Sequence, residues 1–259
     1  MNQKSIKKYP IHITLYRNAT MRIEHFGINI LTDPMLSDKG SFMSFVVPDK
    51  KNNPTTDLPV PIEKILEDID VVLISHLHPD KFDQKAMELI PKNKPIICVY
   101  EDSIILREMG FRNVHTINDT LKWKDVTIHR QDASQGEHEI EDQLGKVTGF
   151  IIEAPGYDTL YWVGDSILDN DVRKNIHRTK PEIIITHSGG ALHLGEHQIL
   201  MNSDDTVEIA RQAPEAKVVA VHLDALDHCL ETRESLKQRV KEAKIHNIFI
   251  PLDGQRLTL

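Results

Sequence analysis

Four polar residues of this chain each follow a short apolar run: one aspartate and three histidines. The four are His76, Asp165, His187 and His222. Sheets with parallel strands bind ligands beyond the carboxyl ends of those strands, so we expect these side chains to meet at one edge. Imidazole and carboxylate are the ligands expected for a borderline divalent cation such as zinc. The pattern therefore predicts a metal site.

The densest motif lies just past the first of these runs. His76 and His78 are spaced i, i+2, so both can face one ion, and Asp80 follows in the same turn. Pro79 fixes its own φ and stiffens the spacing. Three polar groups in an apolar neighbourhood are costly without a task, which favours a functional site over a structural one.

Two patterns of hydrophobicity predict the elements that position these residues. Alternation with period two predicts strands at 11–16, 21–26 and 28–31, before a proline-rich stretch at 33–61 that we expect to be a long functional loop or lid. Afterwards, apolar strands alternate with amphipathic helices, as in the helices expected at 83–90, 203–212 and 232–243. Strands buried on both faces need helices outside them, so we expect one domain, residues 1–259, with two packed sheets between helical layers.

Composition narrows the class of protein. The 259 residues are 40% hydrophobic and 27% charged, which is ordinary for a globular chain. The 31 basic and 39 acidic residues give a net charge of −8, which argues against nucleic acid as a partner. No apolar run is long enough to cross a bilayer, and the first residues do not form a secretory signal, so we expect a cytoplasmic protein without a membrane partner.

Taken in order, the motifs resemble those of a known family. His76-x-His78-x-Asp80, then Gly164-Asp165-Ser166, then His222, are similar to the metallo-β-lactamase-fold hydrolases. The turn at 33–36 and the segment 145–150 resemble the branch that includes ascorbate-phosphate lactonase. The resemblance covers nearly the whole chain. It implies an α/β fold, a four-layer αββα sandwich, with a metal site at its open edge.

The resemblance also implies a set of ligands. A first ion would be held by His76, His78, a third histidine and the bridging Asp165. A second ion would use Asp80, the residue after it, Asp165 and His222. Zinc is the expected metal, with manganese as the alternative. A metal-activated water would attack an ester, lactone, amide or phosphodiester, and Asp80 would orient that water or take its proton.

Lys81 departs from the family pattern, which usually has histidine there. An ammonium has no lone pair to offer a metal, so Lys81 is a poor ligand. It can place its charge near Asp80 in lieu of the second ion, leaving a one-metal enzyme with Lys81 as a catalytic residue. Alternatively, it can point to solvent at the start of the next helix. We favour the first interpretation.

The third metal ligand should lie in the loop 131–139. Register against the segment 145–150 puts Gln135 at the family's histidine, and glutamine is a weak zinc ligand. His138, three residues on, is the better chemical candidate, and Asp132 is the next. We therefore predict His138 as the ligand.

The glycine-containing segment 187–197 holds further histidines. We expect His187 to face the pocket and to act in catalysis. His193 and His197 are predicted to be surface residues, with anion binding or metal ligation as alternatives. His228 could orient His222.

Three functions follow as hypotheses. The first is a metal-dependent hydrolase that cleaves an ester, lactone or phosphoester bond of a small anionic substrate. The second is a binding protein on the same fold that has lost its metal. The third, a nucleic-acid phosphodiesterase, is disfavoured by the acidic balance. A homo-oligomer is compatible with all three, and 33–61 could be a lid or a dimer contact.

Overall fold

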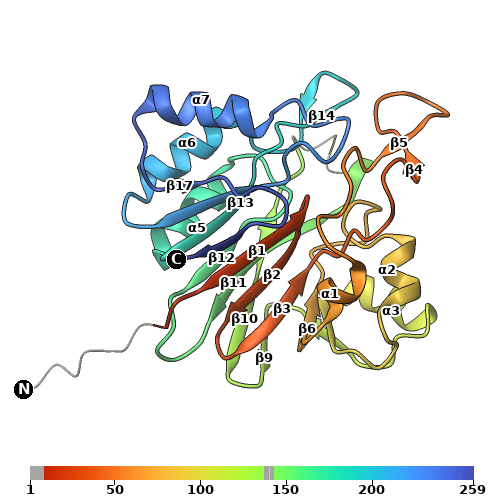
Figure 1. Ribbon diagram of the computed structural model, residues 1–259. Helices are drawn as coiled ribbons and strands as arrows, with labels where there is room; N and C mark the ends of the chain where they lie inside the picture. Colours follow the sequence, from red (N-terminus) through yellow and green to blue (C-terminus); the bar gives the residue numbers. More distant parts are fainter. Residues whose placement is uncertain (1–8, 137–139, 141–142) are drawn as a thin grey trace, which may run out of the picture.

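The computed structural model describes residues 9–136, 140 and 143–259, and within them two large sheets pack face to face (Figure 1). Each sheet has seven strands. His138, the predicted third ligand, lies outside the described residues. None of the helices in the described part of the chain is long and apolar enough to span a bilayer.

The first sheet begins with antiparallel hairpins and continues with parallel strands. β1, β2 and β3 pair antiparallel, and β3, β6, β7 and β8 pair parallel. The period-two alternation of the N-terminal segments suits such hairpins, in which successive side chains point to opposite faces. In spatial order the strands are β18 (Arg256–Thr258), β1 (His12–Arg17), β2 (Thr20–His25), β3 (Ile28–Thr32), β6 (Val71–Leu73), β7 (Ile96–Val99) and β8 (Val114–Ile117).

The second sheet mirrors this arrangement. β9, β10, β11 and β12 pair antiparallel, and β12, β13, β16 and β17 pair parallel. In spatial order the strands are β17 (Ile248–Phe249), β16 (Lys217–Val221), β13 (Ile183–His187), β12 (Leu160–Trp162), β11 (Val147–Glu153), β10 (Val126–Ala133) and β9 (Thr120–Trp123).

Helices cover the outer face of each sheet. One buried cluster fills the space between the sheets and includes Ile23, Phe150 and Trp162. A second cluster joins α1 (Ile62–Leu66), α2 (Gln84–Leu89) and α3 (Tyr100–Glu108) to the first sheet. A third, together with its partly buried neighbours, joins α5 (Asn170–Thr179) and α6 (Ser203–Gln212) to the second sheet, beside α7 (Arg233–Ala243). The predicted αββα sandwich is therefore confirmed.

The predicted helix starts are largely correct, because their caps are local. Asp83, Asn202 and Thr232 each accept a hydrogen bond from the backbone N–H three residues on, which satisfies an otherwise free donor of the first turn. Sequence patterns did not predict α5, although Asp169 caps it in the same way. α5 is mostly polar, and its buried face consists of Val172 and Ile176, so it contains no run of apolar residues that would mark it in the sequence.

Two small hairpins lie near the carboxyl ends of the parallel strands. The proline-rich stretch contains β4 (Phe42–Met43) and β5 (Lys51–Asn53), and the glycine-containing segment after β13 forms β14 (Leu192–His193) and β15 (His197–Gln198). Figure 1 draws both at the upper right, beyond the ends of the large sheets. Both hairpins therefore border the edge of the sheets at which we expect the functional residues to meet.

Candidate metal centre

Asp165 is the residue around which the predicted histidines gather. It follows β12, and its Oδ2 lies 3.5 Å from Nε2 of His76, which follows β6 in the other sheet. Its Oδ1 lies 2.5 Å from Nδ1 of His187 and 3.7 Å from Nε2 of His222. All four side chains are buried. The convergence of strand ends expected from the sequence is what the fold produces.

The rings of His76 and His78 face each other through one nitrogen of each ring. Nε2 of His76 and Nδ1 of His78 are 2.9 Å apart. Nε2 of His78 lies 3.1 Å from the backbone oxygen of Leu144, which can only accept, so that nitrogen carries the proton. Nδ1 of a neutral His78 is then an acceptor.

The other ring nitrogen of His76 is oriented by a short relay. Ser75 Oγ donates to Oδ2 of Asp33 at 2.7 Å and lies 2.9 Å from Nδ1 of His76. When the hydroxyl proton is on Asp33, the hydroxyl accepts from Nδ1, and Nε2 of His76 keeps its lone pair. In that tautomer Nε2 of His76 and Nδ1 of His78 are two acceptors at 2.9 Å, and a shared cation would relieve their repulsion. Such orienting partners are usual around metal-binding histidines.

Gln135 lies beside Asp165 and contributes to the same centre. Its Nε2 donates to Oδ2 of Asp165 at 3.1 Å, and its Oε1 is buried with no hydrogen-bond partner within the described residues. Since the amide oxygen and nitrogen are assigned rather than observed, the group can equally present its oxygen to a cation. Asp132, the alternative third ligand, is exposed on β10, so its side chain lies at the surface rather than in the site.

Lys81 is buried inside the centre. Its Nζ contacts Oδ2 of Asp80, lies 2.9 Å from Oδ2 of Asp165 and lies 3.0 Å from Nε2 of His222. The interpretation in which Lys81 points to solvent is therefore wrong, because its side chain is fully buried.

The carboxylates around Lys81 keep it charged. Burial lowers the pKa of its ammonium, but Asp165, Asp80 and Asp33 outweigh burial and raise the pKa above its usual value. Burial likewise favours the neutral form of Asp80, yet the charge of Lys81 holds the pKa of Asp80 well below its ordinary range. The cation thus lies among the residues that the resemblance assigns to a second metal ion.

His187 has both ring nitrogens engaged. Trp162 donates its Nε1–H to Nε2 of His187 at 2.9 Å, so the imidazole proton is on Nδ1 and faces Asp165. Ligand atoms of Asp165, His187 and His222 lie within 4.8 Å of one another. The hydrogen bond from Trp162 nevertheless leaves His187 without a free lone pair. Its geometry suits holding Asp165 in place better than the catalytic role predicted from the sequence.

Some residues of the centre were not recognised in the sequence. Asn18 donates to the backbone oxygen of Asp80 at 3.0 Å, and Trp162 donates to His187 at 2.9 Å. Asn18 and Asp33 directly follow β1 and β3, which run parallel to β6, so the strand-end rule that found His76 also applies to them. Applied to every strand, that rule would have found both.

A cavity of about 340 Å³ adjoins the centre. Its polar lining residues are His78, Asp80, Gln135, Asp165, His193 and His228. Its apolar lining includes Phe45, Leu144, Leu192, Leu194, Ile199 and Leu200. No Lys or Arg belongs to the described lining. His193, expected at the surface, lies in this wall, whereas His197 is exposed.

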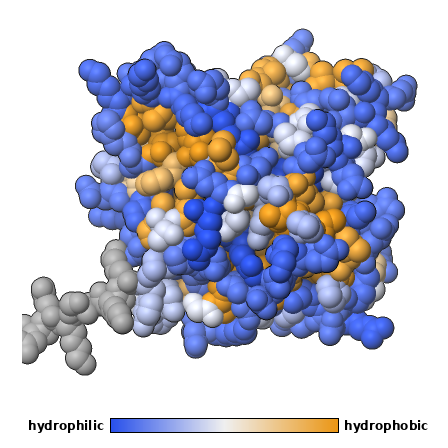
Figure 2. All heavy atoms as spheres, viewed as in Figure 1, coloured by the Kyte–Doolittle hydropathy of each residue, from blue (hydrophilic) through white to orange (hydrophobic). Residues whose placement is uncertain are grey.

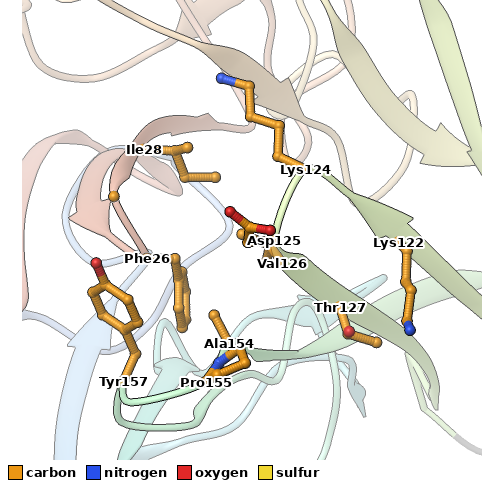
Figure 3. A pocket seen from close by; sticks show the side chains of 11 residues that line it. Phe26, Ile28, Lys122, Lys124, Asp125, Val126, Thr127, Ala154, Pro155 and Tyr157 are labelled. Carbon is orange, nitrogen blue, oxygen red and sulfur yellow. The ribbon is translucent and has the colours of Figure 1, made fainter.

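A larger cavity, of about 690 Å³, is separate from the centre (Figure 3). It lies between the β2–β3 turn, the β9–β10 turn and the segment after β11, where Phe26, Lys124 and Tyr157 surround it. Asp125 is the one carboxylate in its described lining, and no histidine belongs to that lining. Its larger volume therefore does not make it the better candidate for hydrolytic chemistry.

Comparison with known proteins shows the family of this chain. A family model described as the beta-lactamase superfamily domain matches residues 28–223. The chain belongs to this family. The match runs from β3 to the residues just after β16 and includes every predicted ligand. It confirms the fold and the family that the motifs indicated.

Three relatives each align with at least 95% of the chain. UPF0173 protein YddR of Bacillus subtilis is 32% identical over 256 residues, 96% of this chain and 100% of the relative. A crystal structure of a possible metal-dependent hydrolase from Veillonella parvula is 30% identical, with a TM-score of 0.92, over 97% of this chain and 100% of that one. An isothiocyanate hydrolase from Delia radicum gut bacteria is 31% identical, with a TM-score of 0.89, over 95% and 98%. The expectation of a metal-dependent hydrolase is confirmed at this level.

Proposed function

We propose that this chain is a one-metal hydrolase that adds water to an electrophilic carbon of a small uncharged substrate. The observation that carries the proposal is the 2.9 Å approach of Nε2 of His76 to Nδ1 of His78, with Oδ2 of Asp165 3.5 Å from that Nε2. Two atoms that each lie about 2.1 Å from one zinc ion can be this close. These residues, with the oxygen of Gln135, fit a divalent ion, zinc before manganese.

When bound, such an ion would act as a Lewis acid and lower the pKa of water toward 7. The chain's own residues do the positioning. Asp80 lines the cavity as an ionised carboxylate, so it accepts a hydrogen bond from the attacking water and orients it. Lys81 keeps Asp80 ionised and supplies the positive charge that a second ion would bring. His187 fixes the rotation of the Asp165 carboxylate.

The cavity favours an uncharged substrate over the small anionic one expected from the resemblance. No Lys or Arg belongs to its described lining, so no side-chain cation is placed to pair with an anionic group away from the metal centre. An uncharged substrate therefore fits this lining better than a phosphoester. Esters, lactones and isothiocyanates all offer an uncharged electrophilic carbon.

The isothiocyanate is the first substrate to test, because an isothiocyanate hydrolase aligns with 95% of this chain at 31% identity. Addition of water to the central carbon of R–N=C=S, followed by cleavage of the C–N bond, gives R–NH₂ and carbonyl sulfide. The two protons of water end on the amine nitrogen and its oxygen ends in carbonyl sulfide. The lactonase-like branch and the cytoplasmic location stay predictions.

A substrate panel tests the proposal. Protein stripped with a chelator and reloaded with one equivalent of zinc or manganese is given benzyl isothiocyanate, an uncharged lactone, an uncharged ester and bis(p-nitrophenyl) phosphate. We expect turnover of at least one carbon substrate, loss of that turnover in His76→Ala, and no turnover of the phosphodiester. Exclusive activity on the phosphodiester, or full activity of His76→Ala, would contradict the proposal.

A further inference from the structure

We propose that Phe45 and Leu194 form an apolar subsite that binds the organic substituent of the substrate; this rests on the proposed function. Phe45 lies in the β4–β5 flap, residues 41–53, and Leu194 lies at the tip of the β14–β15 hairpin. Both line the cavity that contains Asp80 and Asp165. A substituent attached to the reacting carbon therefore extends toward these two side chains.

Both side chains expose apolar surface that a ligand would cover. Phe45 is 44% exposed and Leu194 is 81% exposed. Figure 2 shows hydrophobic residues at the edge where Figure 1 draws β4, β5 and β14. Removing such surface from water is favourable in proportion to the area covered, so an apolar substituent gains affinity here. The small volume of the cavity suits a substituent of a few carbons or one ring.

The flap is held in position by Asp227. Its Oδ2 accepts from Ser44 Oγ at 2.5 Å and from Asn52 Nδ2 at 3.1 Å. Its Oδ1 accepts from the backbone N–H of Phe45 at 3.1 Å and from Asn53 Nδ2 at 2.9 Å. Four donors on one carboxylate fix the backbone that carries Phe45. The subsite is therefore a built feature, and Asp227 is a positioning residue.

The residue after Asp227 completes this wall. The ring of His228 meets that of Phe45 edge-on, with centroids 4.7 Å apart, and lies 6.4 Å from the ring of His222. Burial lowers the pKa of His228, so its imidazole is neutral at pH 7, and its Nδ1 is buried with no partner among the described residues. An aromatic wall without charge continues from the metal centre to Phe45, which favours an uncharged substituent.

Binding of unreactive neutral probes tests the subsite independently of the reaction. Isothermal titration calorimetry of the zinc-loaded protein with n-alkyl ureas, from ethyl to hexyl, measures the gain in affinity per CH₂. We expect Kd to fall about three- to fourfold per CH₂ over the first few carbons. Phe45→Ala and Leu194→Ser should flatten the series, as should Asp227→Ala, which releases the flap while zinc content stays unchanged.

Val46→Ala is the matched control. Val46 lies in the same flap and is 59% exposed, but it does not line the cavity, so its variant should keep the wild-type series. A flat series in the wild type, or a wild-type series in both Phe45→Ala and Leu194→Ser, would overturn the subsite. If ureas bind with the expected series and no isothiocyanate, ester or lactone is hydrolysed, the proposed function fails and the subsite stands. If a carbon substrate is hydrolysed at a rate that does not depend on the length of its organic substituent, the subsite fails and the proposed function stands.

Discussion

The ammonium of Lys81 lies 2.9 Å from Oδ2 of Asp165, and both side chains are buried. A buried carboxylate needs a cation beside it, because leaving a charge unpaired in the interior is costly. Lys81 meets this need for Asp80 and Asp165 together. We infer that the lysine replaces a second metal ion, and that His76, His78 and Asp165 hold the remaining one.

Exchange of this lysine for a ligand should restore a second ion. Lys81→His supplies a neutral nitrogen beside Asp80, Asp165 and His222 in place of the ammonium. We expect the zinc content to rise from about one to about two ions per chain, measured by elemental analysis after gel filtration. Lys81→His protein that still holds one ion would contradict the inference.

Lys81→Met is the matched control for that experiment. It removes the charge and adds no ligand, so the zinc content should not reach two. Two carboxylates are left without their cation, and we expect the free energy of unfolding to fall by about 3–5 kcal/mol. Urea denaturation in the presence of a chelator measures this loss, and an unchanged midpoint would show that the ion pairs do not stabilise the fold.

Trp162 should affect the metal without touching it. Trp162→Phe keeps a ring in the buried position and deletes the N–H that fixes the tautomer of His187. We expect zinc affinity to fall about 10- to 100-fold, as for other partners that orient ligands, in competition with a chromogenic chelator. Tyr161→Phe, on the same strand but packed among the residues near α5, should leave affinity unchanged. Equal affinities in all three proteins would remove His187 from the positioning role.

Much of this centre could be predicted because strand ends are visible in the sequence. Four short apolar runs end at one edge of the two sheets, and each is followed by a polar residue. The sequence therefore predicted that these residues meet, and the structure brings His76, His187 and His222 together around Asp165. The position of Lys81 required the burial that only the structure gives. The tautomer of His187 could not be predicted from the sequence either, because it depends on a hydrogen bond from Trp162. That residue is 25 positions away in the chain and lies in a neighbouring strand.

The cavity shows a different limit of sequence patterns. Its walls come from the β4–β5 flap and the β14–β15 hairpin, whose strands are only two or three residues long. Such short strands have too few residues for a periodic signal. The position of the β4–β5 flap depends on four hydrogen bonds to Asp227, which is about 175 residues away in the sequence. No local sequence pattern predicts such long-range contacts.

Acid should destabilise the metal-free protein partly through His222. Burial first, and then the charge of Lys81, lower the pKa of His222 to about 4. Above pH 6.5 the imidazole is neutral in both the folded and the unfolded chain and contributes nothing. As the pH falls from 6.5 toward 4, the unfolded chain takes up the proton first, so the free energy of unfolding drops by about 3 kcal/mol.

His222→Gln isolates this contribution. His76 and His187 also have pKa values lowered by burial, so the wild type and the variant should both lose stability in acid. The slope of unfolding free energy against pH between 6.5 and 4, from urea denaturation with a chelator present, should be shallower in His222→Gln. Parallel slopes would mean that folding does not lower the pKa of His222.

Metal stoichiometry tests the central claim most directly. Elemental analysis of gently purified wild-type protein and of His76→Ala, with the chain concentration from amino-acid analysis, counts the ions. We predict about one divalent transition metal per wild-type chain and close to none in His76→Ala. Two ions in the wild type, or an unchanged content in His76→Ala, would contradict the account.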